Sequence, residues 1–190
     1  MTYIKCLILA PIGLAFTLLA WILSPFLPLF SALQLGACDN GSIPQRLEPR
    51  LPLWLAWFQT PDNSLWGDAG WRTVHCPHYK SYLGMVKWLF RNPGYGFAWS
   101  VLAAQPPAGQ FITAIGDMTV NDGVHGNAGW YLSRTDGAFR FRWIVKIIPG
   151  RCFMLDVGWC MPVSGITDGS KLLFYGINPR FPKFGTEVLK

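Results

Sequence analysis

The chain has 190 residues, of which 51% are hydrophobic and 14% are charged, against about 25% charged in an ordinary soluble domain. Five cysteines, an odd number without dense spacing, argue against a secreted disulfide framework and favour reduced thiols. The net charge of +6 suits an anionic membrane or nucleic acid, but it is too diffuse to choose between them. Such a charge-poor chain is expected to bury surface against a membrane, a partner or copies of itself.

The first predicted element is an apolar segment from Cys6 to Cys38, which contains no charged residue. Because a bilayer core needs about 20 apolar helical residues, this segment is long enough to cross a membrane. The prolines of Ser24–Pro28 interrupt it, and Leu29 to Ala37 is too short to span alone. One kinked, tilted span and one span followed by a re-entrant segment both fit this pattern.

Two processing signals compete with a retained anchor. A cleaved signal peptide has an apolar region of about 7–15 residues, which is much shorter than this segment. The sequence Leu35-Gly36-Ala37-Cys38 resembles a bacterial lipobox, which leaves lipidation of Cys38 open. Only Lys5 precedes the segment, whereas Arg46, Arg50 and Arg72 follow it, so the positive-inside rule places the C-terminal domain in the cytoplasm.

A Pro-rich and Trp-rich linker spans residues 39–78. Within it, Trp54, Trp57 and Phe58 are spaced so that a short helix would put them on one face. Aromatic side chains of this kind suit the membrane interface, and they suit the lid of a domain core equally well.

Two motifs carry a family resemblance. Residues 51–63 read LPLWLAWFQTPDN, and residues 86–97 read VKWLFRNPGYGF. They resemble motifs of an uncharacterised protein family encoded by tailed bacteriophages and prophages, and the resemblance extends from about Leu51 to Pro182. It implies a phage or prophage origin and a bacterial host membrane, and it implies no catalytic residue.

The densest group of potential metal ligands is His75, Cys76 and His78. Structural zinc sites need four ligands, and this spacing does not match the usual paired-ligand pattern. A proline-containing loop explains the same residues without a metal. No cofactor is therefore expected, and a metal at these three residues stays an alternative.

The clearest soluble helix is predicted from Tyr79 to Arg91, ended by Asn92-Pro93-Gly94. Its apolar stripe is Tyr79, Tyr82, Leu83, Val86 and Phe90, and its basic stripe includes Lys80, Lys87 and Arg91. The helix either lies on the inner leaflet or packs on the core with a solvated basic face. The interface hypothesis thus comprises Trp54, Trp57, Phe58, Lys80, Lys87 and Arg91.

From Tyr95 onward the hydrophobic period is two, which indicates strands. The predicted strands are 97–104, 111–120, 128–133, 138–148, 151–161 and 172–177, separated by Gly-containing turns. In the strand that begins at Phe139, aromatic and basic residues alternate. We expect the aromatic side to face the core, which argues against nucleic-acid binding, since that needs both residue types on one exposed face. Asp117, Asp122, His125 and Asp136 could converge at a sheet edge.

The sequence therefore predicts an α+β protein: a membrane-inserted N-terminal helix (1–38), the linker (39–78), and a domain (79–190) with one basic amphipathic helix and an antiparallel meander or small sandwich. Three hypotheses follow. The first is a non-enzymatic phage protein at the host inner membrane that binds a host or phage protein and can self-associate. The second is a virion or genome-delivery component. The third is a membrane-bound metal-dependent hydrolase.

Overall fold

The computed structural model describes residues 2–35, 47–123, 125–163, 165–182 and 184–185. It has the predicted α+β class, with an apolar N-terminal helix and an antiparallel sheet. The chain forms two compact units, one of residues 1–14 and 102–190 and the other of residues 15–101. Each unit is described by itself.

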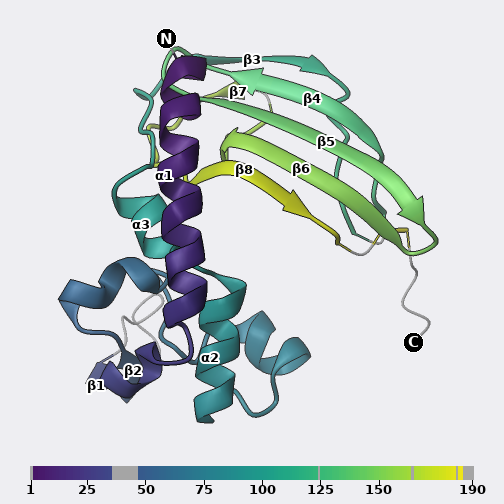
Figure 1. Ribbon diagram of the computed structural model, residues 1–190. Helices are drawn as coiled ribbons and strands as arrows, with labels where there is room; N and C mark the ends of the chain where they lie inside the picture. The colour runs from purple at the N-terminus through teal and green to yellow at the C-terminus, as the bar shows by residue number, and fades with distance from the viewer. Residues whose placement is uncertain (1, 36–46, 124, 164, 183, 186–190) are drawn as a thin grey trace. The chain divides into compact units, whose positions relative to one another are not determined.

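The first unit is built on a six-stranded antiparallel sheet, drawn as one twisted layer in Figure 1. In spatial order its strands are β7 (Gly165–Ile166), β3 (Phe111–Gly116), β4 (Gly129–Arg134), β5 (Phe139–Ile148), β6 (Arg151–Trp159) and β8 (Phe174–Arg180). Short turns join β4 to β5 and β5 to β6, where Gly150 adopts a positive φ of 76°. The four predicted strands from 111 to 161 and the one near 172 are all confirmed, with shifted ends.

The two sides of this sheet differ in burial. The inner face carries Tyr131, Ser133, Arg140, Arg142, Ile144, Cys152, Met154 and Asp156, and it packs against Val120 and Phe184. The opposite side, here called the aromatic face, carries Trp130, Phe141, Trp143, Val145, Phe153, Leu155, Val157, Ile177 and Phe181, all exposed or half-exposed. The predicted alternation on β5 is confirmed, but the expectation that its aromatic side forms the core holds only for Phe139, which is buried against Tyr3 of α1, and is wrong for Trp143 and Val145. The basic side can be buried because Asp156 neutralises part of its charge.

The first turns of helix α1 (Thr2–Leu23) pack on this unit through small residues. Cys6 and Ala10 are buried, and a Cβ added to Gly13 would lie 3.3 Å from Leu102. Thr2 donates a hydrogen bond to the carbonyl of Asp136 (2.9 Å), which holds the end of the helix. Large apolar residues on the other side of the helix remain exposed, among them Ile4, Leu7 and Ile8.

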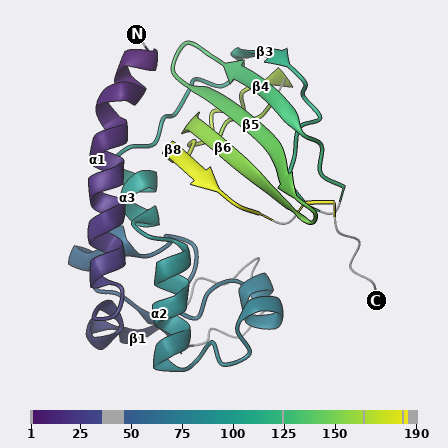
Figure 2. The same ribbon diagram turned by 45° about the vertical axis from the view of Figure 1, so that its right-hand side comes forward.

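The second unit packs against one side of the last turns of α1, where Ala20 is buried. Its core consists of Ala20, Leu27, Leu51, Leu55, Phe58, Leu65 and Leu89. Further elements are the 3-10 helices Leu27–Phe30 and Leu53–Phe58, the hairpin of β1 (Ala32–Leu35) and β2 (Leu47–Arg50), the π-helix Trp71–His75, and helices α2 (Tyr82–Arg91) and α3 (Tyr95–Ser100), of which Figure 2 shows the two α-helices. Phe16 of α1 stacks on Phe58 and Phe97, with ring centroids 4.9 and 4.1 Å apart.

The predicted strand 97–104 is wrong, because the structure has helix α3 there. Gly94 precedes α3 with a left-handed φ of 64°, which turns the chain directly after α2. Gly96 then lies so close to the preceding segment that an added Cβ would sit 2.4 Å from the carbonyl oxygen of Ala56. This close packing between distant residues decides the conformation, and it leaves no trace in the local hydrophobic period.

Helix α2 is confirmed, but its burial differs from the predicted stripe. Its buried residues are Gly84, Trp88 and Leu89, whereas Leu83 and Phe90 are 66% and 48% exposed. The side of α2 that contains Gly84 can pack this closely because glycine has no side chain: a Cβ at Gly84 would lie 2.5 Å from the carbonyl oxygen of His78. The apolar stripe that the sequence assigns to the helix is therefore largely accessible.

Candidate functional site: a buried arginine–aspartate cluster

The inner face of the sheet holds a cluster of charged side chains around Asp156, which is fully buried. The strand register brings the cluster together. Arg142 on β5 lies directly opposite Asp156 on β6, and Arg140 shares its face two residues away. Arg180 comes from β8, the strand on the other side of β6. Three adjacent strands thus converge on one carboxylate.

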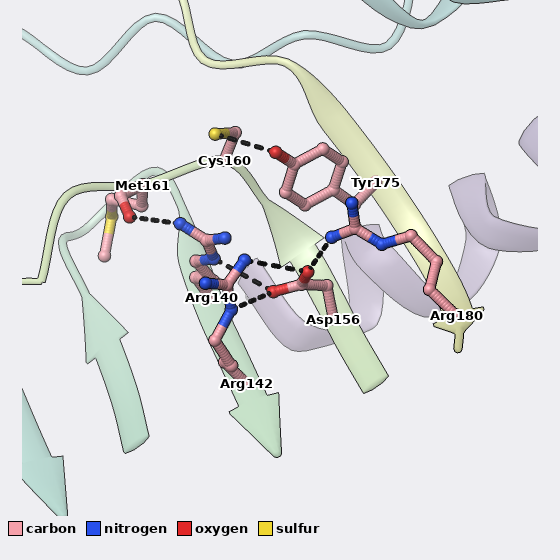
Figure 3. Close-up of polar contacts among 7 residues, drawn as sticks. All are labelled: Arg140, Arg142, Asp156, Cys160, Met161, Tyr175 and Arg180. Carbon is pink, nitrogen blue, oxygen red and sulfur yellow. Dashed lines mark hydrogen bonds and ion pairs between the residues drawn. The ribbon is translucent and has the colours of Figure 1, made fainter. Parts of the chain in front are cut away.

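Figure 3 shows how the three guanidinium groups divide the two carboxylate oxygens. Arg142 binds both oxygens, with Nε 2.9 Å from Oδ1 and Nη2 3.0 Å from Oδ2. Arg140 donates from Nε to Oδ1 (3.1 Å) and from Nη1 to the carbonyl of Met161 (3.3 Å). Arg180 donates from Nη2 to Oδ2. The fork of Arg142 is the two-bond geometry that makes arginine–carboxylate pairs specific.

The cluster keeps Asp156 ionised. Burial alone would raise its pKa, but the hydrogen bond from Arg142 and the charges of Arg140, Arg142 and Arg180 lower the pKa below its ordinary value. The pKa of Arg142 is raised, since the attraction of Asp156 outweighs the desolvation that would lower it. An ionised carboxylate tied to three cations has no proton to give, and its lowered pKa makes it a weak base, so it is not suited to general acid–base catalysis.

Tyr175 and Cys160 extend the cluster toward the sheet edge. The hydroxyl of Tyr175 donates to Sγ of Cys160 at 3.0 Å, and Arg140 lies 5.4 Å from the centre of the Tyr175 ring. Burial, followed by the contact with Cys160, raises the pKa of Tyr175 well above its ordinary value. The phenol is therefore neutral at physiological pH. The whole arrangement joins β5, β6 and β8, and its clearest role is to fix the register of these strands.

The structure places the predicted metal ligands at the end of the π-helix Trp71–His75. Cys76 is buried against Trp71 and Trp88, whereas His75 and His78 are exposed. Among the residues that the structure describes, no group of three or more His, Cys, Asp or Glu side chains could hold a metal ion. Within the same part of the chain, Cys6, Cys76, Cys152 and Cys160 are free thiols, and Cys38 lies outside it.

The six residues of the interface hypothesis differ in how far they are buried. Trp54 and Trp57 are 69% and 49% exposed, whereas Phe58 is buried in the core of the second unit. A 3-10 helix spaces residues differently from an α-helix, so the three rings do not share a face. Lys80 lies over the ring of Trp66 (5.3 Å), Arg91 lies over the ring of Trp71 (5.3 Å), and Lys87 is exposed.

The acidic residues expected at a sheet edge have separate contacts. Asp117 accepts hydrogen bonds from Thr119 and Asn127, which lower its pKa. Asp136 lines a polar cavity of about 630 Å³ in the first unit, together with Thr2, Tyr3, Gly109, Gln110, Phe111, Thr113, Arg134, Thr135 and Phe139. This lining offers a carboxylate, a guanidinium and threonine hydroxyls.

Sequence reasoning missed the cluster around Asp156. A usable signal was present, because Asp156 is the one acidic residue in an apolar strand and Arg140 and Arg142 lie on the neighbouring strand across a tight Pro149-Gly150 turn. Counting residues back from that turn pairs Arg142 with Val157, one residue out, because the count does not include the register shift between Lys146 and Ile148 that brings Asp156 opposite Arg142. Arg180 could not have been found this way, because a long connection precedes β8.

The fold and the site together define an α+β protein in which an apolar N-terminal helix packs on an antiparallel sheet tied by a buried arginine–aspartate cluster. The chain belongs to a family of unknown function (DUF7338), which matches residues 1–180. No curated protein and no solved structure matches it.

Proposed function

We propose that the protein is a non-enzymatic membrane protein of bacteriophage origin that acts at the host inner membrane by binding a protein partner. The observation that carries the proposal is the division of helix α1 into two sides. Small residues pack on the protein, whereas large aliphatic residues point away from it, with Leu7 72%, Ile8 61% and Ile22 68% exposed.

The length and composition of α1 match a bilayer. It has 22 residues and a mean hydropathy of 2.4 over its most apolar 18-residue window, and 17% of that window is buried. A rise of about 1.5 Å per residue gives a helix of about 33 Å, close to the hydrocarbon thickness of about 30 Å. A signal sequence or a buried core helix can have this length and composition. The low burial of α1 argues against a core helix.

Lipid contact along the exposed side of α1 would remove a substantial apolar surface from water. Full burial of a Leu or Ile side chain is worth about 1.5–3 kcal/mol. Ile4, Leu7, Ile8, Ile12, Leu14, Leu18, Leu19 and Ile22 are each between 44% and 72% exposed. At about 1 kcal/mol each, these eight side chains supply about 8 kcal/mol, which is enough to hold a protein on a membrane.

Further exposed groups fit the same surface chemistry. Trp54 and Trp57 in the second unit suit headgroup depth, and Lys87 and Arg91 of α2 are exposed cations for an anionic leaflet. The basic residues that follow the apolar segment favour a cytoplasmic C-terminal domain. The free thiols of the described cysteines fit that reducing compartment.

The phage origin rests on the motifs at residues 51–63 and 86–97. The buried polar groups around Asp156 are occupied by ion pairs, which suits a protein that binds a partner rather than one that catalyses a reaction. For a phage protein at a host membrane, such binding could serve superinfection exclusion or takeover of the host. A virion component is the second candidate, and the exposed aromatic face of the sheet favours it because subunits pack through such surfaces.

Fractionation of bacteria that express the full chain alone, with an alkaline carbonate wash, tests the proposal. We expect the protein to stay in the washed inner-membrane pellet and to be absent from purified phage particles. Recovery in the supernatant would refute the membrane role. Stoichiometric presence in particles would favour the virion component.

A further inference from the structure

The aromatic face of the sheet is an apolar surface that α1 covers at one end, where the ring of Tyr3 lies 4.6 Å from that of Phe139. Away from that end, the residues named for this face are exposed or half-exposed. Trp130 lies opposite Trp143 in the register of β4 and β5. The ring of Trp143 is 5.9 Å from that of Phe153, which is 5.5 Å from that of Phe181. On β3 and β7 the same face continues through Phe111, Ile115 and Ile166, which are 77%, 56% and 59% exposed.

This face has the size of a specific protein interface. Without the end under α1, six strands about 4.8 Å apart, with about six residues of about 3.3 Å each, cover roughly 570 Å². Two such faces in contact would bury about 1,150 Å² in total, which exceeds the roughly 1,000 Å² expected of a specific interface and is close to the lower end of the standard range of about 1,200–2,000 Å². The area of one face is also near the upper end of the range for the largest apolar patch of a typical monomer, about 300–600 Å².

The distribution of charge selects the occupant. The arginines of the sheet centre, Arg140, Arg142 and Arg180, lie on the inner face and bind Asp156. The aromatic face has cations only at its ends, as far as the described strands show. There Arg134 donates to Thr113 (3.3 Å) and Arg151 donates to the carbonyl of Phe181 (3.2 Å). The centre of the face therefore offers nothing to the anionic headgroups of a bilayer.

We infer that the aromatic face docks a second copy of this chain, sheet against sheet, so that the protein is a dimer. Each copy brings an equally apolar, charge-free centre, so docking desolvates no unpaired charge. Two sheets packed face to face lie about 10 Å apart, which lets the exposed tryptophan and aliphatic side chains of the two copies interdigitate. The inference concerns a different surface from α1, and it does not depend on the proposed function.

The test is the molar mass of the full chain in a mild detergent at about 10 µM, measured by sedimentation with the bound detergent subtracted. The disrupting variants are Val145→Lys and Ile177→Lys, which place a charge on the aromatic face from two different strands. The matched control is Val101→Lys, since Val101 in the second unit is 51% exposed, between Val145 (37%) and Ile177 (59%). Thermal unfolding by circular dichroism checks that each variant is folded.

We expect a dimer for the wild type and for Val101→Lys, and at least a tenfold weaker dimer for each folded variant of the aromatic face. A monomeric wild type would overturn the inference, as would a dimer that persists in both variants. If the two variants instead lose binding to anionic vesicles while the wild type is monomeric, the face contacts lipid and the inference is wrong. If one variant fails to fold, the other variant decides.

Discussion

Replacing Asp156 by asparagine is the sharpest perturbation of the fold. It leaves Arg140 and Arg142, whose side chains are 11% and 13% exposed, without their counter-charge. Removing one partner of a buried ion pair costs about 3–5 kcal/mol, because the remaining charge stays desolvated. For a chain of this size, each kcal/mol lowers the melting temperature by about 2–4 °C, so the expected decrease is about 6–20 °C.

Thermal and urea unfolding of the detergent-solubilised protein measure this effect. Asp62→Asn is the control, since it makes the same chemical change at an exposed carboxylate and is expected to stay within about 0.5 kcal/mol of the wild type. Arg180→Gln is expected to cost about 1 kcal/mol or less, because the Arg180 side chain is 42% exposed. A loss below about 1 kcal/mol for Asp156→Asn would refute the reasoning.

Three further predictions concern the same two units. The pKa of Asp156 is lowered by folding, so its contribution to stability is complete above the ordinary carboxyl pKa of about 4 and is lost as the pH falls through the folded-state pKa. Acid unfolding followed by circular dichroism should show this loss of stability in the wild type and a smaller loss in Asp156→Asn. Gly158→Ala should destabilise the sheet by more than 2 kcal/mol in urea unfolding, because the new Cβ would lie 2.2 Å from the carbonyl oxygen of Phe139 at a φ of +96°. The control Gly109→Ala, at a φ of +83° with open space around it, should cost about 1 kcal/mol. Equal costs for the two variants would contradict this account. Ser81→Ala should cost about 1 kcal/mol, since the Ser81 hydroxyl accepts from the amide of Gly84 at the start of α2, and an unchanged melting curve would show that this cap is dispensable.

The sequence was most informative where one local signal controls the structure. The alternation and glycine turns after Phe111 predict the strands, and Asn92-Pro93-Gly94 predicts the end of α2, because turn chemistry acts over a few residues. Helix α3 was missed because the contact of Gly96 with Ala56 joins residues that are far apart in sequence.

The buried side of each element was harder to predict than the element itself. For β5 and α2 the type of element was predicted correctly. The side of each element that is buried was predicted wrongly, because the more apolar side was expected to face the core. Arg140 is buried because Asp156 is available on the next strand, and Gly84 is buried because it lets α2 approach His78 closely. Both causes are tertiary contacts. An apolar side that stays exposed, as on the aromatic face, also suggests a partner that a single chain does not show.

Flotation of the purified full chain with anionic vesicles tests the central claim most directly. The double variant Leu7→Asn/Ile8→Asn changes the exposed side of α1, and Ile177→Asn makes a matched change on the sheet. We predict that the wild type and Ile177→Asn float with the vesicles and that the double variant partitions at least tenfold less. Equal flotation of all three proteins, or no flotation of the wild type, would contradict a lipid-contacting α1.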